Sequence, residues 1–400
     1  MATALKSGVF IVAAKRTAFG SMNGSLRNLT PTDLGVVSTL AALQQANLDP
    51  KLVNDVIFGN VSQTAKDTPY LARHVGIRSG ISLEAPAVTL NRLCGSGFES
   101  IVTAAKGIAV GDSQISVAGG AENMSMAPYA VRDIRMGTKF PNDLNLEDTL
   151  WSALNDQYVK MPMALTAEKL GEQFGISRQQ CDEYAVRSQH AWAAANEAGL
   201  FKDEICPVVI KDKKKGEISF EVDEHPRGKA ATIENMNKLP SIFKKEGLVS
   251  AGNASGISDG AGTLILASEE AVKAHGLKPL ARVVSYASVG VDPTIMGHGP
   301  VPAIRKILEL TGKKVEDIDQ YEINEAFAAQ YLACEKDLGL DRKITNVNGG
   351  AVAVGHPTGA SGSRIMGHLT YEMHRNGTKT AIGSACCGGG QGIAIMIEKC

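Results

Sequence analysis

The chain has 400 residues, of which 44% are hydrophobic and 21% charged, and its formal net charge is −1. This composition is typical of a globular protein, no apolar run reaches the roughly 18 residues that cross a bilayer, and a chain of this length is expected to form two or more domains. Without a net positive charge the sequence argues against a nucleic-acid binder or a protein of anionic membrane surfaces.

Cysteine usage indicates free thiols in a reducing compartment. The seven cysteines are an odd number spread thinly along the chain, which is not the pattern of a disulfide scaffold. The eight histidines are scattered, and Cys386 and Cys387 are adjacent rather than separated by two residues as in zinc sites. We therefore expect no metal ion.

The N-terminus has two interpretations. The first acidic residue is Asp33, and the four basic residues before it are Lys6, Lys15, Arg16 and Arg27. This charge bias is typical of a mitochondrial targeting segment. The apolar run at residues 8–14 is equally explained by a buried first strand.

The first 120 residues alternate apolar runs with helical patterns. Strands are expected at residues 9–14, 56–61, 87–91 and 115–118. Thr30 or Thr32 can cap a helix that runs toward Ala46, and a second helix follows residues 93–97. Apolar side chains recur at helical spacing in this second helix, which predicts a buried helix with Cys94 on the turn that enters it.

The middle of the chain differs in composition from the first 120 residues. Residues 121–249 contain several methionines and prolines and long amphipathic segments such as 178–198. We expect a loop domain, inserted in the first half of the chain and covering that half. Within it the polar run at 211–216 lies between two short apolar runs, which predicts a solvated hairpin turn rather than a phosphate site.

From residue 280 the first pattern returns, and it repeats the sequence of the first half. Strands are expected at 280–286 and 319–323, and helices at 302–311 and 326–338. Residues 55–60 (DVIFGN) and 319–324 (DQYEIN) are 264 positions apart, and Cys94 and His356 are 262 apart. The repeat predicts two α/β halves, residues 1–272 and 273–400, whose helix-entry turns meet at the carboxyl ends of strands.

Two reactive side chains stand in glycine-rich turns. Cys94 at a helix N-terminus feels the positive end of the helix dipole, and a nearby imidazole would lower the pKa of its thiol further. His356 lies between Gly355 and Pro357, where backbone N–H groups can approach an oxygen that becomes negative. Taken singly, Cys94 can be a small buried hydrophobe and His356 a structural residue.

Further polar residues have plain structural alternatives. Asn324 comes where a strand turns into a helix, so it can serve as an N-cap, and Ser255 can be a turn residue. None of the glycine-rich segments matches a dinucleotide fingerprint or a phosphate loop.

Five segments together resemble the thiolases, in the order of that family and over almost the full length. They are residues 90–97 (LNRLCGSG), 253–256 (NASG), 324–327 (NEAF), 355–357 (GHP) and 386–390 (CCGGG). Within the family the likeness is greatest to the mitochondrial 3-ketoacyl-CoA thiolases. The resemblance implies an α/β thiolase fold, with two similar halves in five layers, αβαβα, and an inserted loop domain.

The resemblance also implies catalytic roles. Cys94 matches the nucleophile that carries the acyl group, His356 the base that activates it, and Cys386 the second cysteine, a general acid and base. Asn324, through a water, and His356 match one oxyanion hole. The backbone N–H groups of Cys94 and Gly388 match the other.

Substrate contacts are implied in the same way. Ser255 matches a pantetheine contact, Arg227 a contact to the CoA nucleotide, and Met163 and Met296 methionines around the acyl pocket. The implied ligands are CoA and 3-ketoacyl-CoA, and because CoA is a substrate no cofactor is expected.

The sequence departs from the family at two positions. Cys387 stands where the family often has an aliphatic residue, so a thiol-reactivity experiment could mistake it for the catalytic cysteine. Pro162 stands where acetoacetyl-CoA-specific members tend to have histidine. This favours the broader-range degradative enzymes.

The expected activity is CoA-dependent cleavage of 3-ketoacyl-CoA to acetyl-CoA and a shortened acyl-CoA, through an acyl thioester on Cys94, in fatty acid β-oxidation. The alternatives are a thiolase-like acyl-CoA or lipid-binding protein, an acetoacetyl-CoA-specific thiolase, an acyl-CoA hydrolase and a decarboxylating condensing enzyme. We expect a homodimer or homotetramer in the mitochondrial matrix, with an uncleaved N-terminal signal.

Overall fold

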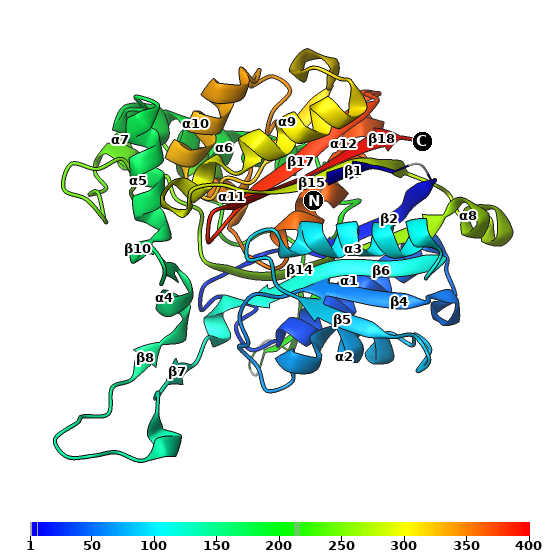
Figure 1. Ribbon diagram of the computed structural model, residues 1–400, viewed down its shortest axis with the longest axis horizontal. Helices are drawn as coiled ribbons and strands as arrows, with labels where there is room; N and C mark the ends of the chain where they lie inside the picture. The colour runs from blue at the N-terminus through cyan, green and yellow to red at the C-terminus, as the bar shows by residue number, and fades with distance from the viewer. Residues whose placement is uncertain (1, 6, 213, 215) are drawn as a thin grey trace.

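The computed structural model describes residues 2–5, 7–212, 214 and 216–400, and its centre is one large mixed β-sheet (Figure 1). The strands of this sheet are β1 (Ala2–Ala4), β2 (Val9–Thr17), β3 (Gly20–Ser21), β4 (Asp55–Gly59), β5 (Ala87–Leu90), β6 (Ile115–Asn123), β11 (Ile205–Cys206), β14 (Ser258–Ser268), β15 (Ala281–Gly290), β16 (Gln320–Ile323), β17 (Thr380–Cys387) and β18 (Gln391–Lys399). Every residue of β6 and β14 is buried, because helices cover both faces of the sheet.

The sheet consists of two half-sheets with equivalent strand order. The first runs β5-β4-β6-β14-β2 and the second β16-β17-β18-β15. They join where β2 meets β15 through two residue pairs, Ile11 with Ala281 and Phe10 with Arg282. Thr345 forms a parallel bridge beside β16, in the place that β5 has beside β4. The predicted internal repeat is therefore confirmed as a structural one.

Helices form three further layers around the half-sheets. The α-helices are α1 (Pro31–Ala46), α2 (Leu71–Arg78), α3 (Ser96–Val110), α4 (Thr149–Ala153), α5 (Met163–Gln173), α6 (Arg178–Glu197), α7 (Ile233–Asn237), α8 (Glu269–His275), α9 (Pro300–Thr311), α10 (Ala328–Leu338), α11 (Ala351–Val354) and α12 (Ser361–Asn376). Helices α3 and α12 lie between the half-sheets, α1 and α2 cover the outside of the first, and α9 and α10 the outside of the second (Figure 1). This is the five-layered arrangement that the resemblance implied.

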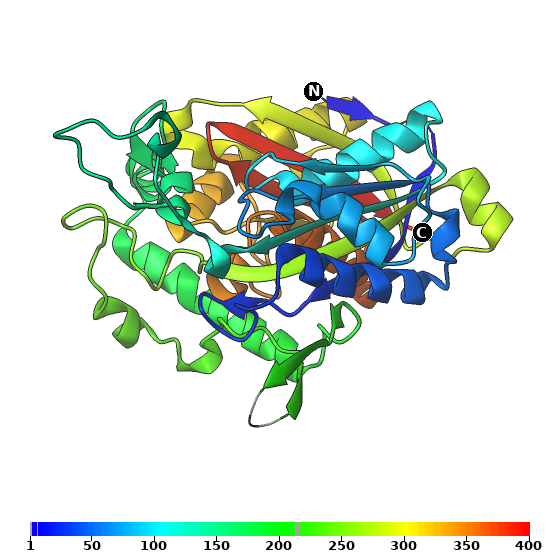
Figure 2. The ribbon, with the colours of Figure 1, turned by 90° about the horizontal axis from the view of Figure 1, so that it is seen from below.

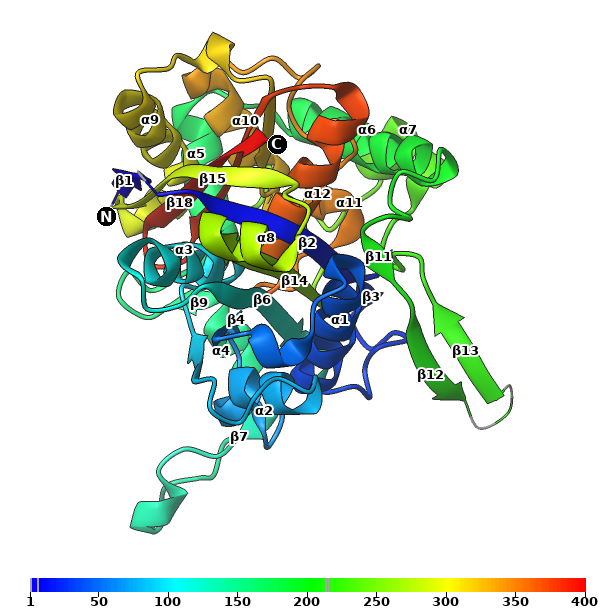
Figure 3. The ribbon, with the colours of Figure 1, turned by 90° about the vertical axis from the view of Figure 1, so that its right-hand side faces the viewer.

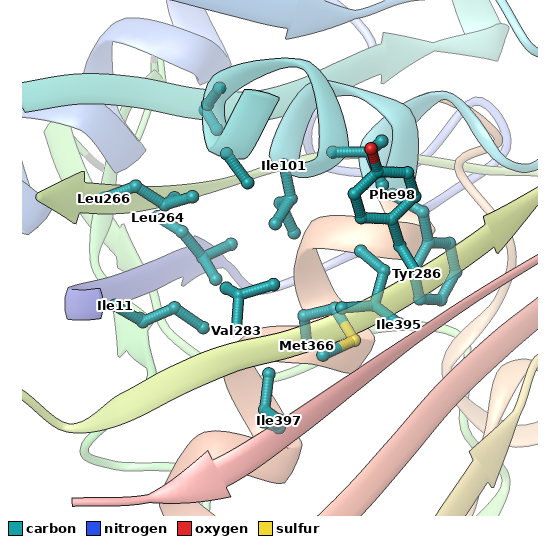
Figure 4. Packing of buried hydrophobic residues seen from close by; sticks show 14 of the residues in the cluster. Ile11, Phe98, Ile101, Leu264, Leu266, Val283, Tyr286, Met366, Ile395 and Ile397 are labelled. Atoms are coloured by element: carbon teal, nitrogen blue, oxygen red, sulfur yellow. The ribbon is translucent and has the colours of Figure 1, made fainter. Parts of the chain in front are cut away.

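The two central helices touch at glycines near their N-termini. A Cβ on Gly97 of α3 would lie 2.7 Å from the backbone nitrogen of Ser363, and a Cβ on Gly362 of α12 would lie 2.6 Å from the carbonyl carbon of Gly97. Below this contact Phe98 and Met366 share one apolar core with both half-sheets (Figure 4). The crossing therefore needs glycine on both helices, and it brings the two helix-entry turns together.

Most expected elements are present, with shifted ends. Thr30, not Thr32, caps α1, in a capping box with Asp33. Strand β4 ends at Gly59, earlier than expected, whereas β6 continues to Asn123. Residues 8–14 largely form β2, as the buried-strand interpretation predicted.

Only part of the segment between β6 and β14 covers the first half, where β11 pairs with β2 and Val208 packs in the core, so the expectation that the segment covers this half holds only in part. Its long helices α5 and α6 pack on α10, and α6 also packs on α11, so they lie against the second half. Tyr184 of α6 stacks on Tyr331 of α10 with ring centroids 4.2 Å apart. Apolar periodicity predicted that these helices bury one face, but it carries no information on which partner covers it.

Two parts of this segment project from the body of the protein (Figures 2 and 3). One is the loop that includes the short strands β7 (Tyr129–Ala130) and β8 (Glu147–Asp148), and the other is the hairpin of β12 (Val208–Asp212) and β13 (Gly216–Phe220). The remaining pair, β9 (Asn155–Asp156) and β10 (Met161–Pro162), lies beside α5. The hairpin is as predicted, although Lys213 and Lys215 of its turn, like Lys6 near the N-terminus, lie outside the described residues.

Among the helices that the described residues form, none is both long and apolar enough to cross a lipid bilayer.

A methyl group at the helix crossing is expected to destabilise the protein. Gly362→Ala forces its Cβ against the backbone of α3, and overpacking of this kind costs about 1–3 kcal/mol or more. Gly367→Ala on the same helix is the matched control, because its Cβ would meet only the Ala14 Cβ, at 3.4 Å. Thermal denaturation should give a lower midpoint for Gly362→Ala, and an equal or higher one for Gly367→Ala, since alanine is the better helix former. Equal midpoints for the two variants would contradict the crossing constraint.

Candidate active site

Five of the residues selected from the sequence line one cavity of about 180 Å³. They are Cys94, Met163, Ser255, Met296 and His356. They come from five separate parts of the chain, and the rest of the wall is largely apolar, with Trp151, Phe243 and Phe327 among its side chains. The structure thus places a thiol and an imidazole at the same hydrophobic hollow.

Gly388 and Arg227 lie at neighbouring hollows. Gly388 lines a second cavity that shares Cys94 and Met163 with the first. Arg227 is exposed and lines a surface pocket that shares Ile257 with the first cavity. The hollows that share these lining residues extend from the cavity at Cys94 to the surface pocket at Arg227.

The turn that carries Cys94 is strained and fully hydrogen-bonded. Leu93 has φ +49°, a left-handed conformation that costs a bulky residue about 1–3 kcal/mol and is found mainly at functional sites. Its N–H donates to Asn91 Oδ1 at 2.8 Å, and the Ser96 hydroxyl both accepts from the Arg92 N–H at 2.9 Å and donates to the Leu93 carbonyl at 2.7 Å. These bonds hold Cys94 at the entrance of α3.

The Cys94 thiol is protonated at rest, contrary to the expectation of a lowered pKa. Burial raises the pKa of Cys94 to about 11, although the backbone N–H groups of Gly388 and of Cys94 itself bond to its sulfur and act in the opposite direction. The loss of hydration outweighs these two hydrogen bonds. Attack by this sulfur therefore requires a base.

His356 is held as a neutral imidazole whose Nε2 carries no hydrogen and accepts from Asn324 Nδ2. The Ser361 hydroxyl donates to the Pro357 carbonyl at 3.2 Å, so at 2.6 Å it accepts the hydrogen of His356 Nδ1. Asn324 Nδ2 lies 3.4 Å from His356 Nε2. Burial, together with the charge of Arg364, lowers the pKa of His356 to about 4. This tautomer suits a base.

Asn324 lies beside His356 and does not cap a helix. Helix α10 begins at Ala328 with Phe327 in the N-cap position, three residues beyond Asn324. The Asn324 backbone N–H donates to the Ser384 carbonyl at 2.9 Å, and this bond fixes the residue at the end of β16. The N-cap alternative is therefore wrong.

Cys386 and Cys387 point to opposite faces of β17 because successive strand residues alternate. Cys386 packs with Met296 and Ala326 next to the cavity, and burial followed by the charge of Cys94 raises the pKa of its thiol well above the usual value. Cys387 is fully buried in the core that contains Phe98, and burial raises its pKa as well. The expectation that Cys387 could compete with Cys94 in a reactivity experiment is therefore not supported.

The Ser255 segment is pinned to the segment that contains Asn324. The Ser255 N–H donates to the Ala326 carbonyl at 3.0 Å, and Ala254 forms an antiparallel bridge with Phe327. Two of the five motifs thus form one wall of the cavity.

Sequence reasoning missed three residues that support the site. Ser361 sets the tautomer of His356, Thr358 lines both cavities, and Glu122 binds the backbone around them. The internal repeat could have pointed to Glu122. Glu122 and Cys386 are 264 positions apart, as are Asn60 and Asn324, so Glu122 has the position in the first half that Cys386 has in the second.

The part of the chain that the structure describes contains no group of three or more His, Cys, Asp or Glu side chains placed to hold a metal ion.

Comparisons with known proteins agree along the whole chain. Family models described as "Thiolase, N-terminal domain" and "Thiolase, C-terminal domain" match residues 9–270 and 277–399. The chain is 57% identical over 396 residues to "3-ketoacyl-CoA thiolase, mitochondrial" of Bos taurus and 55% identical to that of Homo sapiens, in each case over 99% of both chains. The crystal structure of human mitochondrial 3-ketoacyl-CoA thiolase in complex with CoA is 54% identical and superposes with a TM-score of 0.97, over 100% of this chain and 99% of that one.

Two buried histidines are expected to show opposite charge states by NMR of ¹⁵N-labelled imidazoles. With a pKa of about 4, His356 should stay neutral, with its hydrogen on Nδ1, from about pH 8 to 6. Burial alone would lower the pKa of His368, but Glu204, 2.7 Å away, raises it, so His368 should be protonated well above the pH at which His356 is. Ser361→Ala should change the tautomer signals of His356 and leave those of His368 unchanged. Titration of His356 near pH 6.5 would contradict the assignment.

The lowered pKa of His356 also affects the stability of the folded protein. The unfolded chain takes up a proton on His356 near pH 6.5 that the folded chain excludes down to about pH 4. His356 therefore subtracts from the stability of the folded state progressively as the pH falls through this window.

Iodoacetamide is expected to modify Cys94 in the native protein and to spare Cys387. Cys94 lines two cavities, whereas the Cys387 sulfur is enclosed by the core. Peptide mapping after limited alkylation should show Cys94 labelled at least about a hundredfold faster, because a thiol without access to the reagent does not react. Unfolding in denaturant should abolish the difference. Native labelling of Cys387 at a comparable rate would show that this side of β17 opens.

Proposed function

The chain belongs to the thiolase family, and we propose that it is a 3-ketoacyl-CoA thiolase that cleaves 3-ketoacyl-CoA with CoA to give acetyl-CoA and a shortened acyl-CoA. The observation that carries the proposal is the site itself. A thiol and a neutral imidazole share one apolar cavity, a second thiol lies beside it, and two backbone N–H groups bond to the first sulfur. A protein that only binds acyl-CoA needs none of these reactive groups.

In the first half-reaction the Cys94 sulfur attacks the keto carbon of the substrate while its proton passes to His356 Nε2. The N–H groups of Cys94 and Gly388, which are directed at that sulfur, stabilise the negative charge that develops on the keto oxygen. The bond to the neighbouring carbon then breaks and its electron pair enters the enolate of acetyl-CoA. The protonated His356 donates to the enolate oxygen directly, and Asn324 donates to it through a water.

Cys386 delivers the proton that converts this enolate into acetyl-CoA. The pKa of its thiol, raised by burial, ensures that the group is protonated when the enolate forms. The Cys386 thiolate left behind is a strong base for the same reason. It removes the proton of the incoming CoA thiol.

In the second half-reaction the CoA thiolate attacks the thioester on Cys94. The Cys94 sulfur leaves and takes back the proton from His356, and the shortened acyl-CoA is released. Every residue returns to its starting state. A thioester on cysteine exchanges with a thioester of CoA, so neither half-reaction ends in a deep energy well.

CoA is proposed to lie along the hollows that extend from Cys94 to Arg227. Ser255 at the first cavity would contact the pantetheine arm, and Arg227 at the surface would meet the negatively charged nucleotide end. Met163 and Met296, flexible apolar side chains in the cavity wall, would surround the acyl chain. No further cofactor is needed for these steps.

The apolar wall favours a broad acyl range over the acetoacetyl-CoA-specific alternative. Trp151 and Phe243 stack in the wall with ring centroids 6.3 Å apart, and Pro162 lines the same cavity. The chain is also less similar, at 45% identity, to the "Acetyl-CoA acetyltransferase" of Pseudomonas aeruginosa than to the mitochondrial 3-ketoacyl-CoA thiolases.

The cellular setting is inferred from the same relatives. Those named above are mitochondrial 3-ketoacyl-CoA thiolases, so this chain is assigned to mitochondria and to fatty acid oxidation. A matrix location and a homodimeric or homotetrameric assembly remain part of the proposal.

Steady-state cleavage of 3-ketoacyl-CoA substrates from about four to sixteen carbons, with and without CoA, tests the function. We expect acetyl-CoA and a shortened acyl-CoA in equal amounts, formed only with CoA, over several chain lengths. Cys94→Ser should abolish turnover. Cys386→Ala should still form the acyl-enzyme slowly and lose about 10²–10⁴ in turnover, the usual contribution of a general acid and base.

Other products would identify the alternatives. Free acid formed without CoA would indicate a hydrolase, cleavage of the four-carbon substrate alone would indicate an acetoacetyl-CoA-specific enzyme, and binding without any product would indicate an acyl-CoA-binding protein. Unimpaired turnover of Cys386→Ala would remove this residue from the mechanism.

A further inference from the structure

Glu122 is a buried carboxylate that joins two loops of the site. It stands near the end of β6 with 0% of its surface exposed. Its carboxylate accepts from three groups of the loop after β4: Asn60 Nδ2 at 3.2 Å, the Val61 N–H at 3.0 Å and the Ser62 N–H at 3.0 Å. From the loop that enters α12 it accepts the Thr358 hydroxyl and the Gly359 N–H, both at 2.9 Å.

The groups that Glu122 holds line the cavities, whereas Glu122 itself does not. Val61 and Ser62 line the cavity that contains Gly388, and Thr358 lines both cavities and follows His356 by two residues. Glu122 thus lies one layer behind the surface that faces the substrate. Glu122 can therefore affect the reaction only through the positions of the two loops that it holds.

Backbone contacts also hold the loop of His356, since the His356 N–H donates to the Gly256 carbonyl at 2.8 Å. A Cβ on Gly359 would lie 2.9 Å from Glu122 Oε2, from the Ala121 carbonyl and from the Gly59 carbonyl. The turn after His356 therefore lies directly on the ends of β4 and β6, which belong to the other half of the protein. Glu122 supplies acceptors on the first-half side of this junction.

Both carboxylate oxygens are used as acceptors. Oε1 accepts Asn60 Nδ2 and the Ser62 N–H, and Oε2 accepts the Val61 N–H, the Thr358 hydroxyl and the Gly359 N–H. An amide in this place would turn an NH₂ group toward N–H donors. Burial raises the pKa of Glu122 to about 7 against these hydrogen bonds, and its charge in turn raises the pKa of Cys94.

We propose that Glu122 is a positioning residue, whose carboxylate ties the loop after β4 to the loop of His356 and so holds the base in place relative to Cys94. The inference rests on the proposed function for its kinetic consequence but not for its structural one. Misplacement of a reacting group by about 1 Å can cost about a hundredfold in rate. Glu122→Gln, which keeps size but replaces one acceptor by a donor, removes the tie.

The test compares Glu122→Gln with a matched control. Glu168→Gln alters another buried carboxylate that accepts backbone N–H groups, those of Leu248 and Val249, but joins no loop to His356. We expect Glu122→Gln to lose about a hundredfold in kcat, with KM changed less than about threefold, and to shift the ¹⁵N signals of His356. Glu168→Gln should lower the thermal midpoint similarly and keep kcat within about threefold and the His356 signals unchanged.

Two further variants keep the proposal open to refutation. Glu122→Asp retains both acceptors on a shorter side chain and should recover about tenfold of the lost kcat. If Glu122→Gln does not fold, Thr358→Val, which removes one of the five donors, should still shift the His356 signals. Wild-type kcat and wild-type His356 signals in a folded Glu122→Gln protein would overturn the proposal, as would equal kinetic losses in Glu168→Gln.

The His356 NMR signals distinguish failure of the positioning role of Glu122 from failure of the proposed thiolase function. If the wild-type protein shows no thiolase activity, the proposed function fails, whereas shifted His356 signals in Glu122→Gln still support the positioning role. If the wild type is active and the signals do not move, only the positioning role fails.

Discussion

The contact between Gly97 and Gly362, where α3 and α12 cross, is the constraint on which the site depends. It lets two helix N-termini approach at backbone distance in the middle of the protein, with a half-sheet on either side. Cys94 precedes one helix and His356 the other, so a packing contact places a thiol and an imidazole at one cavity. The site is thus a product of the core, and its precision comes from the density of packing around it.

Burial decides the chemistry of this pair. Because burial raises the pKa of Cys94 to about 11 and lowers that of His356 to about 4, transfer of the proton from the thiol to the imidazole is unfavourable at rest. A standing thiolate and imidazolium pair is therefore not the resting state. In the proposed mechanism the proton moves as the sulfur attacks, and the backbone N–H groups of Cys94 and Gly388 stabilise the new negative charge. A site that is neutral at rest also holds an apolar acyl chain without burying an unpaired charge.

The two halves share the same strand order, but equivalent positions in them have different roles. Asn60 and Asn324 occupy equivalent positions, as do Glu122 and Cys386, each pair 264 residues apart. In the second half Asn324 faces His356 and Cys386 lies beside the cavity. In the first half Asn60 binds Glu122, which we propose to be a support. One half thus contributes the nucleophile and its scaffold, and the other the proposed base and acid.

The sequence by itself determined the α/β alternation, the repeat, the buried helix after Cys94 and the residues Cys94, His356 and Ser255 that line the cavity, because these depend on local periodicity and short motifs. Only the tertiary structure decided that α5 and α6 cover the second half, that Cys387 faces the core and that Cys94 is protonated at rest. The partners of Glu122 lie about 60 residues before it and more than 230 after it. Burial and charge are properties of such distant neighbours, so a pattern read along one chain cannot contain them.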